Sequence, residues 1–171
     1  MSDLAKQIRD VPDFPKEGIL FKDITTLLKN PDGFKESIDS IAELYKNKGI
    51  KKVVGVESRG FIIGAPVAYQ IGAGFVPIRK PGKLPAETIS ITYELEYGTD
   101  TIEAHRDAIL SGEKVLIVDD LLATGGTAKA AASLVRQMGG EIVGIAFLVE
   151  LEFLQGIKNL ENYNITSIIK F

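Results

Sequence analysis

At 171 residues, with 45% apolar and 25% charged residues, the chain has the size and balance of one globular domain. The formal net charge of −3 argues against a protein that coats nucleic acid or binds an anionic membrane. The absence of cysteine excludes disulfides, thiolate nucleophiles and cysteine-based zinc sites, and the single histidine, His105, excludes sites that need two histidines. We find neither a membrane-spanning apolar stretch nor the apolar core of a signal peptide, so we expect a cytoplasmic, single-domain protein over residues 1–171.

The N-terminal thirty residues are interrupted by prolines, and we expect a short helix followed by an irregular arm there. A longer helix should follow. Asn30 is suited to cap its first turn, Pro31 fits the first helical position, and apolar residues then recur at helical spacing until Gly49, which would end it.

Five short apolar runs predict strands, at residues 53–56, 75–78, 115–118, 142–149 and 165–169. Helical patterns separate several of them, which is typical of a parallel sheet covered on both faces. Three runs end in polar or charged clusters, at residues 57–60, 79–83 and 119–127. Because ligands of open α/β sheets bind outside the carboxyl ends of the strands, we expect the functional site there.

A different pattern occupies residues 86–106. Apolar residues alternate with polar ones from Ile89 to Tyr97, Gly98-Thr99-Asp100 follows, and the alternation resumes at Ile102. This period of two around a turn predicts a flexible β-hairpin that projects near the site.

The segment 115–127 carries the strongest chemical signal. It combines a buried strand, two adjacent carboxylates, a turn of glycine and threonine, and the start of a helix. Backbone N–H groups at such a helix start can hold a phosphate, and ionised carboxylates accept hydrogen bonds from a sugar diol. The segment therefore predicts a ribose 5-phosphate site, with a merely structural glycine turn as the alternative.

Other phosphate motifs do not fit this chain. It has no P-loop sequence, and Gly72-Ala73-Gly74 lacks the third glycine of a dinucleotide fingerprint and follows a helix instead of a strand.

Five further segments surround this motif, at residues 14–15, 18–25, 57–61, 79–85 and 93–98. Together with residues 115–127 they resemble the type I phosphoribosyltransferase family, and within it the members that use adenine, over nearly the whole chain. The resemblance implies an α/β fold with a mostly parallel twisted sheet flanked by helices, a small hood from residues 1–30 and the projecting hairpin. It also implies a non-proline cis peptide bond between Glu57 and Ser58.

The resemblance further implies binding roles for three parts of a phosphoribosyl diphosphate substrate. The 5-phosphate would be held by Ala123, Thr124, Gly125, Gly126 and Thr127. The ribose hydroxyls would contact Asp119 and Asp120. The diphosphate would contact Glu57, Ser58, Arg79, Lys80 and Lys83, the last acting either in its own subunit or across a dimer interface.

Four residues would form the base site by the same resemblance. Phe21 and Leu121 would sandwich the purine, and backbone groups of Leu20 and Lys22 would read its edge.

The same resemblance implies two catalytic candidates. Glu96 on the hairpin would act as acid or base, with Glu94 as its alternative, and Arg59 would pair with the diphosphate or the base pocket. Ribosyl transfer builds positive charge at the anomeric carbon, which nearby carboxylates stabilise, and negative charge on the leaving group, which cations and N–H groups stabilise.

The reaction implied by the resemblance converts adenine and phosphoribosyl diphosphate to AMP and diphosphate. Mg²⁺ would be held mainly by the substrate, with water-mediated contact to Asp119 or Asp120 and no direct protein ligand. We expect a homodimer and no nucleic-acid or membrane partner. The alternatives are another purine base, or a regulator that binds phosphoribosyl diphosphate without catalysis; such a regulator would need a DNA-binding helix pair or a basic face.

Overall fold

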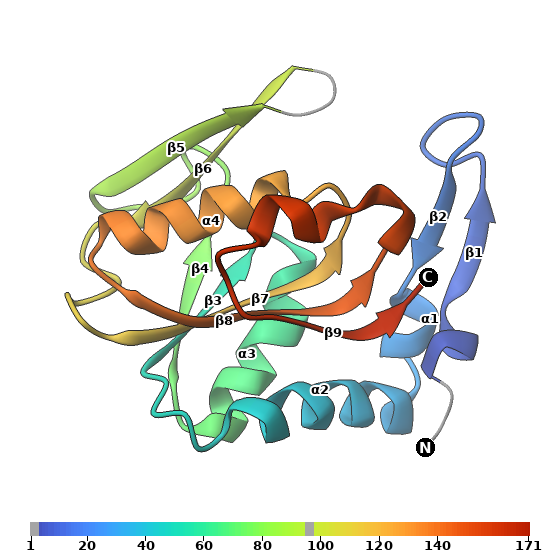
Figure 1. The fold of residues 1–171 in the computed structure, drawn as a ribbon, viewed down its shortest axis with the longest axis horizontal. Coiled ribbons are helices and arrows are strands. Elements are labelled where there is room, and N and C mark those ends of the chain that lie inside the picture. The colour runs from blue at the N-terminus through green and yellow to red at the C-terminus, as the bar shows by residue number, and fades with distance from the viewer. Residues whose placement is uncertain (1–3, 95–97) are drawn as a thin grey trace.

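A five-stranded parallel sheet forms the centre of the computed structural model, which describes residues 4–94 and 98–171 (Figure 1). Its strand order is β4-β3-β7-β8-β9, and each neighbouring pair is parallel. The strands are β3 (Lys52–Val56), β4 (Gly74–Ile78), β7 (Lys114–Leu122), β8 (Glu141–Glu150) and β9 (Ile165–Lys170). This confirms the predicted parallel α/β sheet.

The sheet is buried on both faces, which explains why its strands are apolar without alternation. In β7, the four consecutive residues from Val115 to Val118 are fully buried. Figure 1 shows helix α4 (Gly126–Gln137) on one face, and α2 (Pro31–Tyr45) and α3 (Arg59–Ile71) on the other. Two apolar cores result, one on each side of the sheet.

The predicted start of the helix after Asn30 is confirmed. The Asn30 side chain accepts hydrogen bonds from the backbone N–H groups of Asp32, at 3.0 Å, and Gly33, at 3.2 Å, and Pro31 is the first residue of α2. The helix ends at Tyr45, and Gly49 lies in the following connection with a φ of +70°.

The expectation of an irregular N-terminal arm was wrong. After the short helix η1 (Leu4–Gln7), strands β1 (Arg9–Pro12) and β2 (Leu20–Asp23) pair as an antiparallel ribbon, and α1 (Thr25–Leu28) follows. Proline is compatible with this ribbon because Pro12 is the last residue of its strand, opposite Leu20.

The predicted hairpin is confirmed as β5 (Thr88–Glu94) and β6 (Thr99–His105). Ile89, Ile91 and Tyr93 pack against the core on one face, whereas the alternating polar residues are exposed. Thr99 and Asp100 were expected in the turn but belong to β6, because they pair with Glu94 and Tyr93. Leu95, Glu96 and Tyr97 lie outside the described residues.

Two short helices, η2 (Glu152–Leu154) and η3 (Gly156–Leu160), connect β8 to β9. Within residues 4–94 and 98–171, we find no helix of the length and apolarity needed to span a membrane.

Candidate active site

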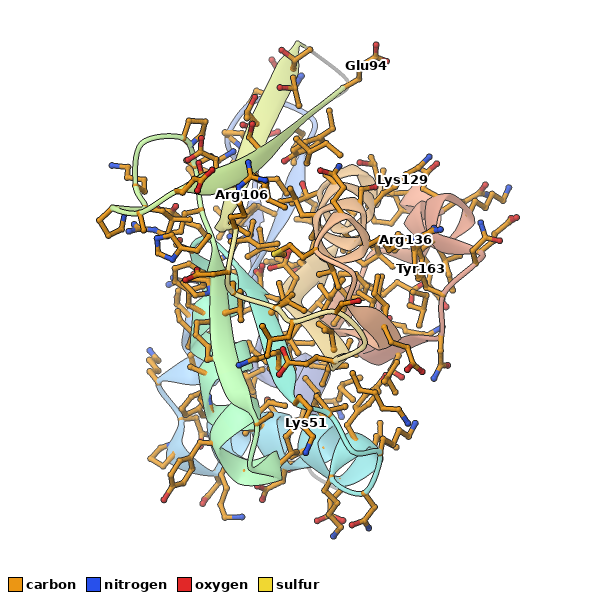
Figure 2. All side chains as sticks on the ribbon, turned by 90° about the vertical axis from the view of Figure 1, so that its left-hand side faces the viewer. Lys51, Glu94, Arg106, Lys129, Arg136 and Tyr163 are labelled. Atoms are coloured by element: carbon orange, nitrogen blue, oxygen red, sulfur yellow. The ribbon has the colours of Figure 1, made fainter. Side chains whose placement is uncertain are left out.

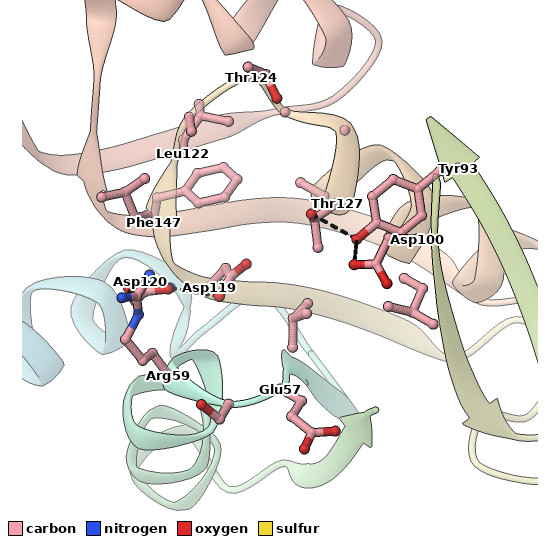
Figure 3. Close-up of a pocket in the computed structure, with 18 of the residues that line it drawn as sticks. Glu57, Arg59, Tyr93, Asp100, Asp119, Asp120, Leu122, Thr124, Thr127 and Phe147 are labelled. Atoms are coloured by element: carbon pink, nitrogen blue, oxygen red, sulfur yellow. Dashed lines mark hydrogen bonds and ion pairs between the residues drawn. The ribbon is translucent and has the colours of Figure 1, made fainter. Parts of the chain in front are cut away.

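A pocket of about 450 Å³ opens at the carboxyl ends of β3 and β7, where the polar clusters were predicted to meet (Figure 3). Its walls come from the ends of β3, β4 and β7, the connection from β7 to α4, and the hairpin. The pocket thus lies at the end of the sheet where the site was predicted.

The turn between β7 and α4 forms one wall of the pocket. All five predicted 5-phosphate residues line it: Ala123, Thr124, Gly125, Gly126 and Thr127. Gly125 has a φ of +84°, a left-handed conformation that favours glycine. The turn leads directly into α4, whose first backbone N–H groups have no partner within the helix, so it can hold an anion.

The short helix η3 packs against the backbone of this turn. A Cβ atom on Gly156 would lie 2.1 Å from the carbonyl oxygen of Ala123, and one on Gly125 would lie 2.5 Å from the carbonyl oxygen of Gly156. Nδ2 of Asn159 donates a hydrogen bond to the Thr124 carbonyl at 2.7 Å. Sequence reasoning missed Gly156 and Asn159, because nothing local to them indicates this long-range contact.

The carboxylate pair lies in the last part of β7, which is longer than predicted. The strand continues through Asp119 and Asp120 to Leu122, because β8 supplies ladder partners along that length. Burial raises the pKa of both carboxyls. The negative charge of Asp120 raises the pKa of Asp119 further, whereas the Arg59 guanidinium lowers the pKa of Asp120 and so opposes the effect of burial there.

Arg59, the first residue of α3, pairs with this acidic site. Its Nε lies 2.6 Å from Oδ2 of Asp120. Gly60 follows it, and a Cβ there would lie 2.8 Å from Oδ1 of Asp119, so glycine permits the close approach of α3 to β7.

Opposite the turn, the ends of β3 and β4 bring basic groups to the pocket. Glu57 accepts hydrogen bonds from Nε and Nη2 of Arg79 at 3.2 and 3.1 Å, and from the backbone N–H of Lys80 at 3.0 Å. The Arg79 guanidinium therefore lowers the pKa of the Glu57 carboxyl. The cis peptide bond between Glu57 and Ser58 is confirmed.

Lys83 does not line the pocket with the other predicted diphosphate residues. The structure places its carbonyl oxygen 3.2 Å from Nη1 of Arg79, as an acceptor.

Two of the four predicted base-site residues lie at or near the pocket. Leu121 lines it, and the Phe21 ring lies near it, with its centroid 5.5 Å from Cζ of Arg59. The other two, Leu20 and Lys22, belong to β2, and their predicted backbone contacts to the base stay a prediction. The Leu20 side chain is half exposed, and the Lys22 side chain contacts Asp10 and the Phe171 ring.

The hairpin contributes three pocket residues that sequence reasoning missed, Tyr93, Asp100 and Ile102. The Tyr93 hydroxyl donates to Oδ2 of Asp100 at 3.1 Å and lies 3.1 Å from Oγ1 of Thr127 (Figure 3). Asp100 also pairs with Lys80. The alternation of the hairpin placed Tyr93 on the inward face, which was an available signal; none existed for the pairing of Asp100.

The structure describes only one of the two candidate acids of the hairpin. Glu96 lies outside the described residues. Glu94 has an exposed side chain, and Figure 2 places it at the outer end of the hairpin.

Among residues 4–94 and 98–171, no group of three or more acidic or histidine side chains could hold a metal ion. The carboxylates of Asp119 and Asp120 are the hard oxygen groups at the pocket that suit an outer, water-mediated contact to Mg²⁺. The residues therefore fit a metal that the substrate brings with it.

Residues 23–169, which include the residues that line the pocket, match the family described as the phosphoribosyl transferase domain. The adenine phosphoribosyltransferase of Acetivibrio thermocellus is 59% identical over 170 residues, covering 99% of both chains. The crystal structure of the adenine phosphoribosyltransferase from Thermoanaerobacter pseudethanolicus superposes with a TM-score of 0.95 at 55% identity, covering 98% of each chain. The Saccharomyces cerevisiae enzyme, complexed with adenine and an imino-altritol bisphosphate, gives a TM-score of 0.90 at 41% identity, over 98% of this chain and 99% of that one.

The fold and the site thus define a phosphoribosyltransferase of type I. Within that class, the chain belongs to the adenine phosphoribosyltransferase family.

Proposed function

We propose that this chain transfers the 5-phosphoribosyl group from phosphoribosyl diphosphate to adenine, giving AMP and diphosphate in purine salvage. One observation carries the proposal. The glycine-threonine turn that follows Asp119 and Asp120 faces Arg79 and Lys80 across a single pocket. A phosphate site, a diol site and a second cationic site in one cavity match the three parts of this substrate.

Each part of the pocket has its own role in binding. The turn from Ala123 to Thr127 holds the 5-phosphate, and Asp119 and Asp120 accept hydrogen bonds from the ribose hydroxyls. The diphosphate is held by Arg79, Lys80 and the loop of Glu57 and Ser58. Lys83, which does not line this pocket, contacts the diphosphate either in its own subunit or across the dimer interface. Glu57 acts here through Arg79, which it orients by two hydrogen bonds.

In the transfer, the bond from the anomeric carbon to the diphosphate oxygen breaks and a bond to a purine nitrogen forms. The carboxylates of Asp119 and Asp120 stabilise the positive charge that develops on the ribose, and the cations of Arg79 and Lys80 stabilise the departing diphosphate. The purine nitrogen loses its proton, which the carboxylate of Glu96 accepts.

The purine lies between Leu121 and Phe21, with backbone groups of Leu20 and Lys22 at its edge. The contact between the Phe21 ring and the Arg59 guanidinium supports this placement, because it brings the hood to the rim of the pocket. Arg59 contacts the base pocket or the diphosphate from the same position.

Mg²⁺ bound with the substrate neutralises charge on the diphosphate and so favours its departure. Asp119 or Asp120 would hold this ion through water.

The chain acts as one phosphoribosyltransferase domain over residues 1–171, located in the cytoplasm and assembled as a homodimer. The lack of cysteine supports the cytoplasm. Ile62 and Tyr69, which are 43% and 88% exposed on α3, support the dimer, because a second subunit would cover them. A sedimentation velocity experiment that finds only monomers would contradict this assembly.

Diphosphate release with phosphoribosyl diphosphate and Mg²⁺ tests the function, with adenine, hypoxanthine, guanine and xanthine as alternative bases. We expect release with adenine and at least about tenfold lower kcat/KM with the others, since the lost base contacts cost more than 1.4 kcal/mol. Preference for an oxopurine would overturn the base assignment. Tight binding without release for any base would indicate a regulator.

A further inference from the structure

Asp100 places a negative charge beside two groups that are proposed to bind phosphates, Lys80 and the turn from Ala123 to Thr127. Its carboxylate pairs with the ammonium group of Lys80, a proposed diphosphate residue, and accepts a hydrogen bond from the Tyr93 hydroxyl at 3.1 Å. Burial disfavours the charged carboxylate, but the hydrogen bonds from Lys80, Thr101 and Tyr93 together lower the pKa of Asp100, so it is ionised at neutral pH.

The same network reaches the 5-phosphate turn. Oγ1 of Thr127 lies 3.1 Å from the Tyr93 hydroxyl, and the Tyr93 ring and Glu94 carbonyl lie 3.7 and 3.6 Å from where a Cβ on Gly126 would be. The hairpin therefore rests on the turn at the point where a 5-phosphate would bind (Figure 3).

The protons in this network are limited in number. An ionised carboxylate can only accept, so Tyr93 uses its one hydroxyl proton on Asp100. The Tyr93 oxygen can then only accept from Thr127, whose proton is turned to Tyr93. While Asp100 holds this arrangement, the Thr127 hydroxyl proton is used, and the positive charge of Lys80 is already paired with a carboxylate.

We propose that Asp100 competes with the phosphate groups of the substrate, and that it thereby makes the site select ligands that engage the 5-phosphate turn and Lys80 together. The inference rests on the proposed function and names a specificity-determining residue for it. A ligand with one phosphate group must compete with the contacts among Lys80, Asp100, Tyr93 and Thr127, and it gains a contact to only one of Lys80 and Thr127. Phosphoribosyl diphosphate displaces it once and gains both contacts.

This arrangement has a thermodynamic signature. If the same hydrogen-bond network competes with ligands at both subsites, a ligand that breaks the network at one subsite strengthens binding at the other. By reciprocity, each ligand changes the affinity for the other by the same factor. Ribose 5-phosphate should therefore tighten the binding of inorganic diphosphate, and diphosphate should tighten that of ribose 5-phosphate.

Calorimetric titration with ribose 5-phosphate and inorganic diphosphate, alone and in each other's presence, tests the proposal. In Asp100→Asn, we expect each ligand alone to bind about two- to fivefold tighter, the range of an ion pair with exposed partners, and the mutual strengthening to fall by the same factor. In Tyr93→Phe, the link to Thr127 is cut while Lys80 keeps its partner. The mutual strengthening should fall, ribose 5-phosphate should bind tighter, and diphosphate alone should bind as in the wild type.

Two control variants separate this mechanism from general effects. Glu87→Gln removes an acidic charge at the base of the hairpin, where Glu87 pairs with Arg106, and should change neither affinity nor coupling. Thr101→Val removes the side-chain hydrogen bond to Thr92 on the exposed face of the hairpin. It keeps the Thr101 backbone N–H that donates to Asp100, and should also leave the coupling intact.

Unchanged coupling in Asp100→Asn, or weaker diphosphate binding, would overturn the inference and leave the function intact if that variant still forms AMP. A wild-type protein that binds neither ligand and forms no AMP would overturn the proposed function itself.

Discussion

Nε of Arg59 lies 2.6 Å from Oδ2 of Asp120, and the same guanidinium lies 5.5 Å from the centroid of the Phe21 ring. Arg59 begins α3, Asp120 lies near the end of β7, and Phe21 belongs to the N-terminal ribbon. One side chain thus joins the sheet to the hood at the rim of the pocket, between the proposed ribose and base sites.

Replacement of Asp120 tests the ribose site. In Asp120→Asn, a neutral amide faces both the ribose hydroxyls and Arg59, so charge-assisted hydrogen bonds worth about 1.5–3 kcal/mol are lost. We expect kcat/KM for phosphoribosyl diphosphate to fall roughly 10- to 100-fold in initial-rate measurements. Asp39→Asn, which removes a partly exposed carboxylate on α2, is the control. Equal rates in the Asp120 variant and the wild type would refute the assigned role.

A second prediction concerns the support behind the 5-phosphate turn. In Gly156→Ala, the new Cβ would meet the Ala123 carbonyl oxygen at 2.1 Å, so one of two backbone segments must move. We expect KM for phosphoribosyl diphosphate to rise with little change in KM for adenine, and the free energy of unfolding to fall by about 1–3 kcal/mol.

The matched control for this substitution is Gly74→Ala in β4. A Cβ there would lie 3.4 Å from the nearest atom, Cδ of the flexible Lys52 side chain. If both variants raise KM equally, or if Gly156→Ala affects adenine and phosphoribosyl diphosphate alike, then η3 does not shape the turn.

A third prediction concerns the pH dependence of stability. Hydrogen bonds from Thr25 and Arg9 lower the pKa of Asp23 from 3.8 to about 2. Because the pKa is lower in the folded chain, this carboxylate stabilises the fold above pH about 4, and the contribution disappears as the pH falls toward about 2. We expect Asp23→Asn to lower the free energy of unfolding by about 1 kcal/mol at pH 7.

Urea denaturation of both proteins between pH 7 and pH 2 measures this difference. It should shrink below pH about 4 and vanish near pH 2. A difference that stays constant over this range would show that the ionised form of Asp23 has no stabilising role.

Removal of Mg²⁺ gives a fourth prediction. Because Mg²⁺ is proposed to arrive with the substrate, chelation should abolish turnover while the thermal midpoint of the ligand-free protein stays the same. A clear drop in that midpoint on chelation would indicate a structural metal site and contradict a metal held by the substrate.

The sequence predicted the sheet well because its signals are local. The apolar run from Val115 to Val118 is a strand, and Asn30 caps a helix, as their residue types require. The end of β7 was misplaced, since Asp119 and Asp120 resemble a strand end although β8 continues to pair beside them. The N-terminal ribbon was missed because four-residue strands show too little pattern, and their pairing across the intervening loop decides the structure.

In the candidate site, too, the residues that are contiguous in the sequence were predicted and the long-range contacts were not. The phosphate turn and the carboxylate pair are contiguous, so one motif contains them. The contact of Tyr93 with Thr127 joins residues 34 positions apart, and that of Lys80 with Asp100 joins residues 20 apart. Contacts of this kind depend on where the hairpin docks on α4, which no local pattern encodes.

The most direct test of the whole account is the stoichiometry of one reaction. The protein is mixed with phosphoribosyl diphosphate, Mg²⁺ and adenine, and AMP and diphosphate are quantified by chromatography, with Asp120→Asn as the impaired reference. The account predicts AMP and diphosphate in equal amounts, formed far more slowly by the variant. Diphosphate without AMP, or neither product despite bound phosphoribosyl diphosphate, would contradict it.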